Sequence, residues 1–139
     1  MILLAMLLQA AAAPAPASAP AMVVVDERTT MQREPVPHGR IGMSTAYRIT
    51  DAVPGRNFEF RRRILDKGAA IGLHVIAHDE VYYVLAGEGD VTSDGVTRRV
   101  GEGMTAYLFD GANVGIKQVG KAPLSLIVAY PLQGRVAAK

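Results

Sequence analysis

The feature that most restricts the fold is the division of the chain into short runs rich in Val, Ile, Tyr, Phe and Thr, separated by turn residues. Runs of this composition and length are typical of β-strands. We predict strands over Thr45–Thr50, Phe58–Leu65, Ala70–Ile76, Glu80–Leu85, Gly89–Ser93, Val96–Val100, Met104–Phe109, Val114–Val119 and Leu124–Tyr130. No segment shows the 3.6-residue apolar period and the caps of a helix. The sequence therefore predicts an all-β sandwich or barrel, of which the jelly roll is one standard form.

Asp94-Gly95 lies between two alternating runs and predicts a two-residue hairpin. The type I′ turn of such a hairpin needs positive φ at both central residues, which Asp-Gly tolerates. With 139 residues and no internal repeat, the chain fits one domain. We divide it into a leader (1–21), an N-terminal arm with room for one short strand (22–44), a barrel (45–132) and a C-terminal tail (133–139).

The leader is uncharged, and the first charged residue of the chain is Asp26. Its apolar block, Ile2–Leu8, followed by Ala, Pro and Ser, resembles a secretory signal peptide that lacks the positive n-region. Ala15-Pro16-Ala17 and Ala19-Pro20-Ala21 supply the small residues of a cleavage site. The block is much shorter than the roughly 20 apolar residues that span a membrane. We expect cleavage and export to the periplasm or the exterior, without a stable membrane span; the alternative is an uncleaved anchor.

Composition removes several classes of function. Lys and Arg number 15 against 13 Asp and Glu, so the net charge of +2 gives no reason to expect a nucleic-acid partner. The absence of cysteine excludes disulfides, zinc–thiolate sites and cysteine nucleophiles. The sequence shows no glycine-rich phosphate loop, serine triad pattern or basic–aromatic surface.

The stretch Ile71–Gly89 contains two of the three histidines. Alternate side chains of a strand share a face, so an extended backbone places His74, His78 and Glu80 on one face. Two histidines and a carboxylate form a set that Fe, Mn, Ni or Zn accepts. If the chain instead turns at Ala77–Asp79, His78 points to solvent and a His74–Glu80 pair remains.

The same stretch resembles the first motif of the cupin superfamily of small jelly-roll barrels. Gly68 is followed by five residues and His74, and Glu80 is followed by six residues and Gly87, whereas Ile76 replaces the second histidine of the motif. In the weaker second motif, Gly103 and Gly111 match, while Phe109, Val114 and Gln118 replace its Pro, His and Asn. The resemblance covers roughly Gly68 to Tyr130.

The resemblance implies a jelly-roll barrel whose motif histidines and glutamate bind one divalent metal. Only His74 and Glu80 of that set are present, so a bound metal (Fe, Mn, Ni or Zn) and a metal-free cavity both stay open. Without metal, His74 beside Glu80 is a candidate general acid or base. Tyr82 has the same strand parity and is a candidate hydrogen-bond donor to a ligand or a packing residue.

Ile76 has the same parity as His74 and is expected to line the cavity, and Val114, Ile116 and Gln118 form its opposite wall if the second motif is aligned correctly. An apolar lining of this kind favours an organic ligand with one or two polar groups. His38, in the arm, is a solvated histidine or, if the arm folds over the barrel mouth, the missing ligand.

The run Phe58–Leu65 alternates between two faces. One face carries Phe58, Phe60, Arg62 and Ile64, and the other carries Glu59, Arg61 and Arg63. If the aromatic face is interior, Arg62 reaches the cavity and binds a carboxylate or phosphate through paired hydrogen bonds. Otherwise Arg62 lies at the rim with its head in water.

Three functions follow as hypotheses. The first is an enzyme acting on a sugar or organic acid by isomerase, lyase or dioxygenase chemistry. The second is a non-catalytic module that binds such a small molecule. The third is a structural role as a homodimer, through outer residues such as Val81, Tyr83 and Leu85.

Overall fold

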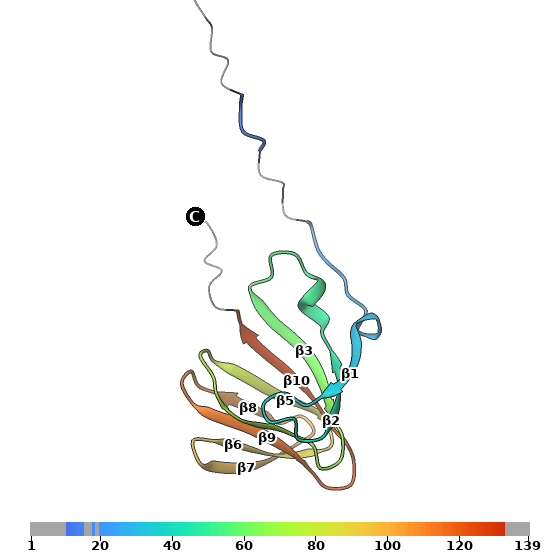
Figure 1. Ribbon diagram of the computed structural model, residues 1–139, viewed down its shortest axis with the longest axis vertical. Helices are drawn as coiled ribbons and strands as arrows, with labels where there is room; N and C mark the ends of the chain where they lie inside the picture. Colours follow the sequence, from blue (N-terminus) through green and yellow to red (C-terminus); the bar gives the residue numbers. More distant parts are fainter. Residues whose placement is uncertain (1–10, 16–17, 19, 133–139) are drawn as a thin grey trace, which may run out of the picture.

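The computed structural model describes residues 11–15, 18 and 20–132 (Figure 1). The apolar block of the predicted leader and the predicted tail (133–139) lie outside the described residues. Two antiparallel sheets face each other as the halves of a jelly-roll barrel. Six strands pair in the order β1-β2-β3-β10-β5-β8, and four pair in the order β4-β9-β6-β7. The prediction of an all-β fold is confirmed.

The larger sheet consists of β1 (Met31–Pro35), β2 (Met43–Tyr47), β3 (Phe58–Leu65), β5 (Glu80–Ala86), β8 (Thr105–Leu108) and β10 (Leu124–Pro131). The smaller sheet consists of β4 (Ala70–Val75), β6 (Glu88–Ser93), β7 (Val96–Gly101) and β9 (Asn113–Val119). Two 3-10 helices, η1 (Glu27–Thr30) and η2 (Ile49–Ala52), complete the elements. No helix in this described part of the chain has the length and hydrophobicity needed to cross a membrane.

Every predicted strand is present, and β3 has the predicted bounds. The strand predicted over Thr45–Thr50 is shifted, because β2 ends at Tyr47 and η2 follows. The Thr50 hydroxyl donates to the Glu59 carboxylate (3.0 Å) and accepts from the Phe60 amide (3.1 Å). A threonine that bonds in this way stabilises a turn instead of continuing the strand.

The predicted Asp94-Gly95 hairpin is confirmed. Asp94 has φ of 46° and Gly95 has φ of 80°, and Ser93 pairs with Val96 across the turn. Both central residues therefore have the positive φ of a type I′ turn.

The arm contributes more than its short length indicates. Its one strand, β1, pairs along its whole length with β2, which in turn pairs with β3. The sheet is thereby extended on the side of β3, and the loop between β1 and β2 lies against the mouth of the barrel.

The hydrophobic core fills the space between the sheets beside β6, β9 and β10. Its fully buried side chains include Leu65, Val84, Ile116, Leu124 and Leu126. The alternating apolar residues of strands from both sheets meet there, as in other two-sheet folds.

Candidate functional site

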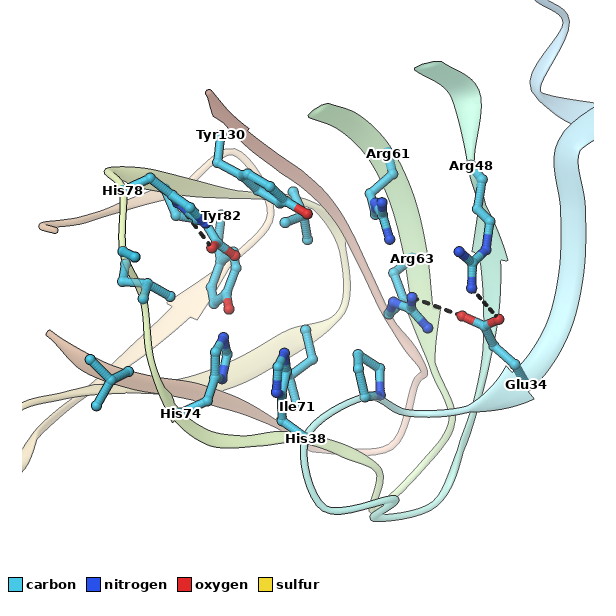
Figure 2. Close-up of a pocket in the computed structure, with 16 residues that line it drawn as sticks. Glu34, His38, Arg48, Arg61, Arg63, Ile71, His74, His78, Tyr82 and Tyr130 are labelled. Carbon is cyan, nitrogen blue, oxygen red and sulfur yellow. Dashed lines mark hydrogen bonds and ion pairs between the residues drawn. The ribbon is translucent and has the colours of Figure 1, made fainter. Parts of the chain in front are cut away.

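A cavity of about 410 Å³ opens between the larger sheet and β4 (Figure 2). Its lining comes from β1, β3, β4, β5 and β10 and from the segments that follow β1, β2 and β4. Acid–base groups gather on the side of β4 and β5, and guanidinium groups gather on the side of β2 and β3. The volume is within the range of small-molecule sites.

The position of His78 agrees in part with each of the two alternatives predicted for its segment, the extended strand and the turn. The chain leaves the strand conformation between Val75 and Glu80, yet the His78 side chain lines the cavity. Its ring stacks on Tyr130, with centroids 4.3 Å apart, and its Nδ1 lies 3.9 Å from a carboxylate oxygen of Glu80. The turn therefore positions His78 beside Glu80 instead of exposing it.

His74 lies on the floor of the cavity, where its Nδ1 is 2.9 Å from the Gly72 carbonyl oxygen. A carbonyl only accepts, so Nδ1 carries the proton and the Nε2 lone pair of neutral His74 is left for the cavity.

The predicted metal set does not converge. Among the residues that the structure describes, no three His, Asp or Glu side chains are placed to hold a metal ion. His74, His78 and Glu80, as placed here, therefore do not form the predicted three-ligand site.

Glu80 is nearly fully buried at the side of the cavity. Burial raises the pKa of its carboxyl, and the opposing effects of His78 and Tyr82 do not cancel this. Burial, together with the nearby Glu80 carboxyl, raises the pKa of Tyr82 well above its ordinary value. The Tyr82 hydroxyl lies beside Glu80 without the geometry of a hydrogen bond. Burial thus favours the protonated forms of both groups, and both side chains line the cavity.

The guanidinium side of the cavity is built from neighbouring strands. Arg63, which is 3% exposed, donates to the Ser44 hydroxyl (2.7 Å) and to the Glu34 carboxylate (2.9 Å). Arg48 donates to the other oxygen of Glu34 (2.7 Å). Arg61 pairs with Glu59 through one terminal nitrogen (2.9 Å), while its buried Nε has no hydrogen-bond partner within the described chain.

Arg62, which the sequence placed either in the cavity or at the rim, lies on the face of β3 opposite the cavity. Its guanidinium pairs with Glu27 (2.8 Å) and lies over the Tyr47 ring (4.1 Å). Phe58 and Phe60, on the same face, are 52% and 38% exposed. The placement of Arg62 inside the barrel is therefore wrong, because the interior beside β3 is a polar cavity in which Arg61 and Arg63 find carboxylate partners.

Two other expected lining residues lie away from the cavity. Val114 is fully buried in the core. Gln118 accepts from the Gly68 amide (2.6 Å) and donates to the carbonyls of Gly120 (3.1 Å) and Ala122 (2.7 Å). Gln118 therefore links two loops through hydrogen bonds. Ile76, by contrast, lines the cavity as expected.

His38 is part of the cavity. Its ring is stacked on that of His74, with centroids 3.6 Å apart and planes 4° from parallel. Burial, together with the charges of His74 and Arg63, lowers the pKa of His38. The arm thus brings His38 to the cavity, where the residue stays exposed to solvent, so each of the two alternatives describes part of its position.

Sequence reasoning missed Glu34, Arg48, Arg61 and Arg63. The alternation in β3 separated Arg61 and Arg63 from Arg62, and this was the one available signal for them. Glu34 and Arg48 carried no local signal, because their positions depend on how β1 and β2 pair.

Comparison with solved structures gives the fold. A predicted oxalate decarboxylase from Thermotoga maritima is 24% identical, with a TM-score of 0.68, over 79% of this chain and 99% of that one. The polyketide cyclase RemF from Streptomyces resistomycificus is 19% identical, with a TM-score of 0.69, over 81% of both chains. KdgF from Halomonas sp. is 20% identical, with a TM-score of 0.55, over 65% of this chain and 80% of that one.

No curated protein sequence matches the chain. The family model described as a cupin domain matches residues 61–130, which include the motif residues His74 and Glu80. This match, with the two-sheet barrel and its similarity to solved cupins such as the RmlC-like cupin from Shewanella frigidimarina (20% identical, TM-score 0.59, 78% of this chain and 88% of that one), confirms the resemblance seen in the sequence. The chain belongs to the cupin family.

Proposed function

We propose that this protein, after the export predicted from its leader, binds a small organic acid in the cavity. The observation that carries the proposal is the guanidinium of Arg61, whose buried Nε is unpartnered in the described chain and whose side chain borders the cavity. A guanidinium binds a carboxylate through two parallel hydrogen bonds, and this geometry is strongest where water is excluded.

The neighbouring charges favour an anion. Arg48 and Arg63 share the single carboxylate of Glu34, so the guanidinium side of the cavity has a surplus of positive charge. Ile71, Ile76 and Val128 supply apolar lining for the carbon skeleton of a ligand. Sites of this kind combine apolar surface with a few polar groups that fix orientation.

Proton transfer to or from the bound acid is the second candidate function. It is favoured by Glu80, whose pKa is raised by burial and which lies beside His78 in the cavity. A carboxyl with a raised pKa is suited to exchange protons near neutral pH. Isomerase or lyase chemistry at a carbon next to a carboxylate would use this group, and hydrogen–deuterium exchange of a bound acid in D₂O, lost in Glu80→Gln, would support it.

The binding test is calorimetric titration of the protein with pyruvate, malonate and glucuronate, with glucose as the neutral comparison. We expect an acid to bind and Arg61→Gln to weaken its affinity about tenfold or more, the loss expected from a missing charged hydrogen bond. Glu59 retains Thr50 and Arg56 in this variant, which keeps its buried carboxylate partnered.

Arg62→Gln is the matched control, since it removes the same charge from the neighbouring position on the outer face. It should bind the acid as the unmodified protein does. Equal weakening in both variants, or no binding of any acid, would contradict the proposal.

The homodimer expected from the outer face of β5 stays a separate proposal. Tyr83 and Leu85 are 39% and 38% exposed there. Analytical ultracentrifugation of the protein measures its mass in solution and decides it.

A further inference from the structure

The loop between β1 and β2 has an unusual backbone. We call residues Val36–Gly42 the strap, because they cross the edge of the cavity and bring His38 to its floor. His38, Gly39 and Arg40 have φ of 59°, 109° and 53°. For His and Arg this left-handed conformation is unfavourable, and it persists only where surrounding contacts enforce it.

Three contacts hold the strap in place. Val36 is fully buried, and its amide donates to the Gly42 carbonyl (3.1 Å). The His38 carbonyl lies so close to β4 that a Cβ at Gly72 would be 1.7 Å from its oxygen. The strap is therefore seated against a strand position that has no side chain, and the His38 ring is fixed above it.

The two imidazoles present different groups to the cavity. His74 donates from Nδ1 to the Gly72 carbonyl, so its neutral ring offers an acceptor at Nε2. The His38 ring nitrogens have no hydrogen-bond partner in the described chain, although the ring is stacked on that of His74. An imidazole always carries at least one N–H, so His38 is able to donate to a ligand that also reaches His74.

We propose that His38 is a specificity-determining residue and that the ligand class is the hydroxy acids. The ligand hydroxyl would donate to His74 Nε2 and accept from His38, while the carboxylate binds Arg61. A hydroxyl is the one common group that both donates and accepts at a single atom, which suits two parallel rings 3.6 Å apart. This inference rests on the proposed binding of an organic acid.

The test compares acids that differ by one hydroxyl: lactate with propionate, and malate with succinate. Sites built to hydrogen-bond a hydroxyl discriminate against analogues that lack it, because the hydrogen bonds made to the hydroxyl are lost. We expect the unmodified protein to bind the hydroxy acid of at least one pair about tenfold or more tightly, measured by calorimetry. Equal affinities within both pairs would overturn the inference and leave the proposed function standing.

Two variants test whether His38 binds the ligand hydroxyl or only packs against His74. His38→Phe keeps a ring to stack on His74 but loses the nitrogens, and His38→Gln loses the ring but keeps a terminal amide near the position of Nε2. We expect His38→Phe to lose the preference for the hydroxyl while binding propionate or succinate unchanged, and His38→Gln to keep part of it. If His38 serves only as packing, His38→Phe keeps the full preference, and the inference is overturned.

Arg61→Gln distinguishes this inference from the proposed function. It should weaken both members of a pair equally, since both carry the carboxylate. Failure of every acid to bind the unmodified protein would instead overturn the proposed function, and the hydroxyl preference with it. The free energy of unfolding in urea, measured for each variant, shows that the compared proteins are folded.

Discussion

Two strands direct their side chains into the same barrel, with opposite results. The β9 wall, formed by Val114, Ile116 and Gln118, is filled and lined with apolar groups, and its one polar residue has its hydrogen bonds satisfied by loop backbone. The β3 wall, formed by Glu59, Arg61 and Arg63, is charged, and its two arginines border the cavity. The interior thus has a packed half and a polar half, and only the second can receive a ligand.

The polar half is stabilised by charge pairing. Burial acts to raise the pKa of Glu59, but Arg61, Thr50 and Arg56 outweigh it and lower that pKa. The pKa of Glu34 is also lowered, because its hydrogen bonds to Arg48 and Arg63 outweigh the effect of burial. Each carboxylate is therefore retained in its charged form, as buried charges require.

The largest expected effect is a loss of stability caused by a substitution in the packed half of the interior. Ile116 is 1% exposed, so Ile116→Ala should lower the free energy of unfolding by about 3 kcal/mol through lost burial and a new cavity. Leu73, 60% exposed on β4, is the control, and Leu73→Ala should change it by less than about 0.5 kcal/mol. Urea denaturation measures both. Equal losses would show that the β9 wall is not the packed half.

An intermediate effect is expected on the β3 wall. Glu59→Gln should lower the free energy of unfolding by about 2 kcal/mol at pH 7, because the hydrogen bonds to a charged group are weakened and Arg61 loses its counter-ion. The pKa of Glu59 is lowered on folding, so its contribution is present above the unfolded value of 4.5 and is lost as pH falls through the folded one.

The same substitution at the surface is the control for this prediction. Glu27 pairs with Arg62 outside the barrel, and its side chain is 37% exposed. Glu27→Gln should change the free energy of unfolding by less than about 0.5 kcal/mol. A Glu59→Gln effect as small as this would mean that the charged wall is as weakly coupled as a surface pair.

The smallest effect has the opposite sign. The pKa of Glu80 is raised on folding, so the folded state retains a proton that the unfolded state loses as pH rises above 4.5. The wild-type protein loses this contribution between 4.5 and the folded pKa, whereas Glu80→Gln does not. The variant should therefore gain stability relative to the wild type across that window, measured by urea denaturation at several pH values. A constant or falling difference would contradict this.

The sequence was sufficient for the strands and for one side of the cavity. Period-two alternation and turn residues located the strands, and strand parity correctly placed Glu80 and Tyr82 on one face of β5. Parity divides a strand into two faces without saying which one is interior. In β3 the sequence left open whether the aromatic face is interior. It is exterior, because the interior beside β3 is a polar cavity.

The position of His38 was not predictable for a different reason. It depends on the left-handed backbone of the strap and on a contact with Gly72, 34 positions further along the chain by residue number. Local patterns carry no information about such a contact. Glu34 and Arg48 are in the same situation, since their place at the cavity follows from the pairing of β1 with β2 and of β2 with β3.

The close approach at Gly72 gives a way to classify related cupins. The region matched by the family model, residues 61–130, contains Gly72 but not the strap that needs it. In a relative with any side chain at this position, a carbonyl cannot occupy the place that the His38 carbonyl occupies here. The mouth of its barrel must then be covered differently or left open. Glycine at position 72 and a strap with this backbone path should therefore be inherited together, as a diagnostic pair for barrels closed in this way.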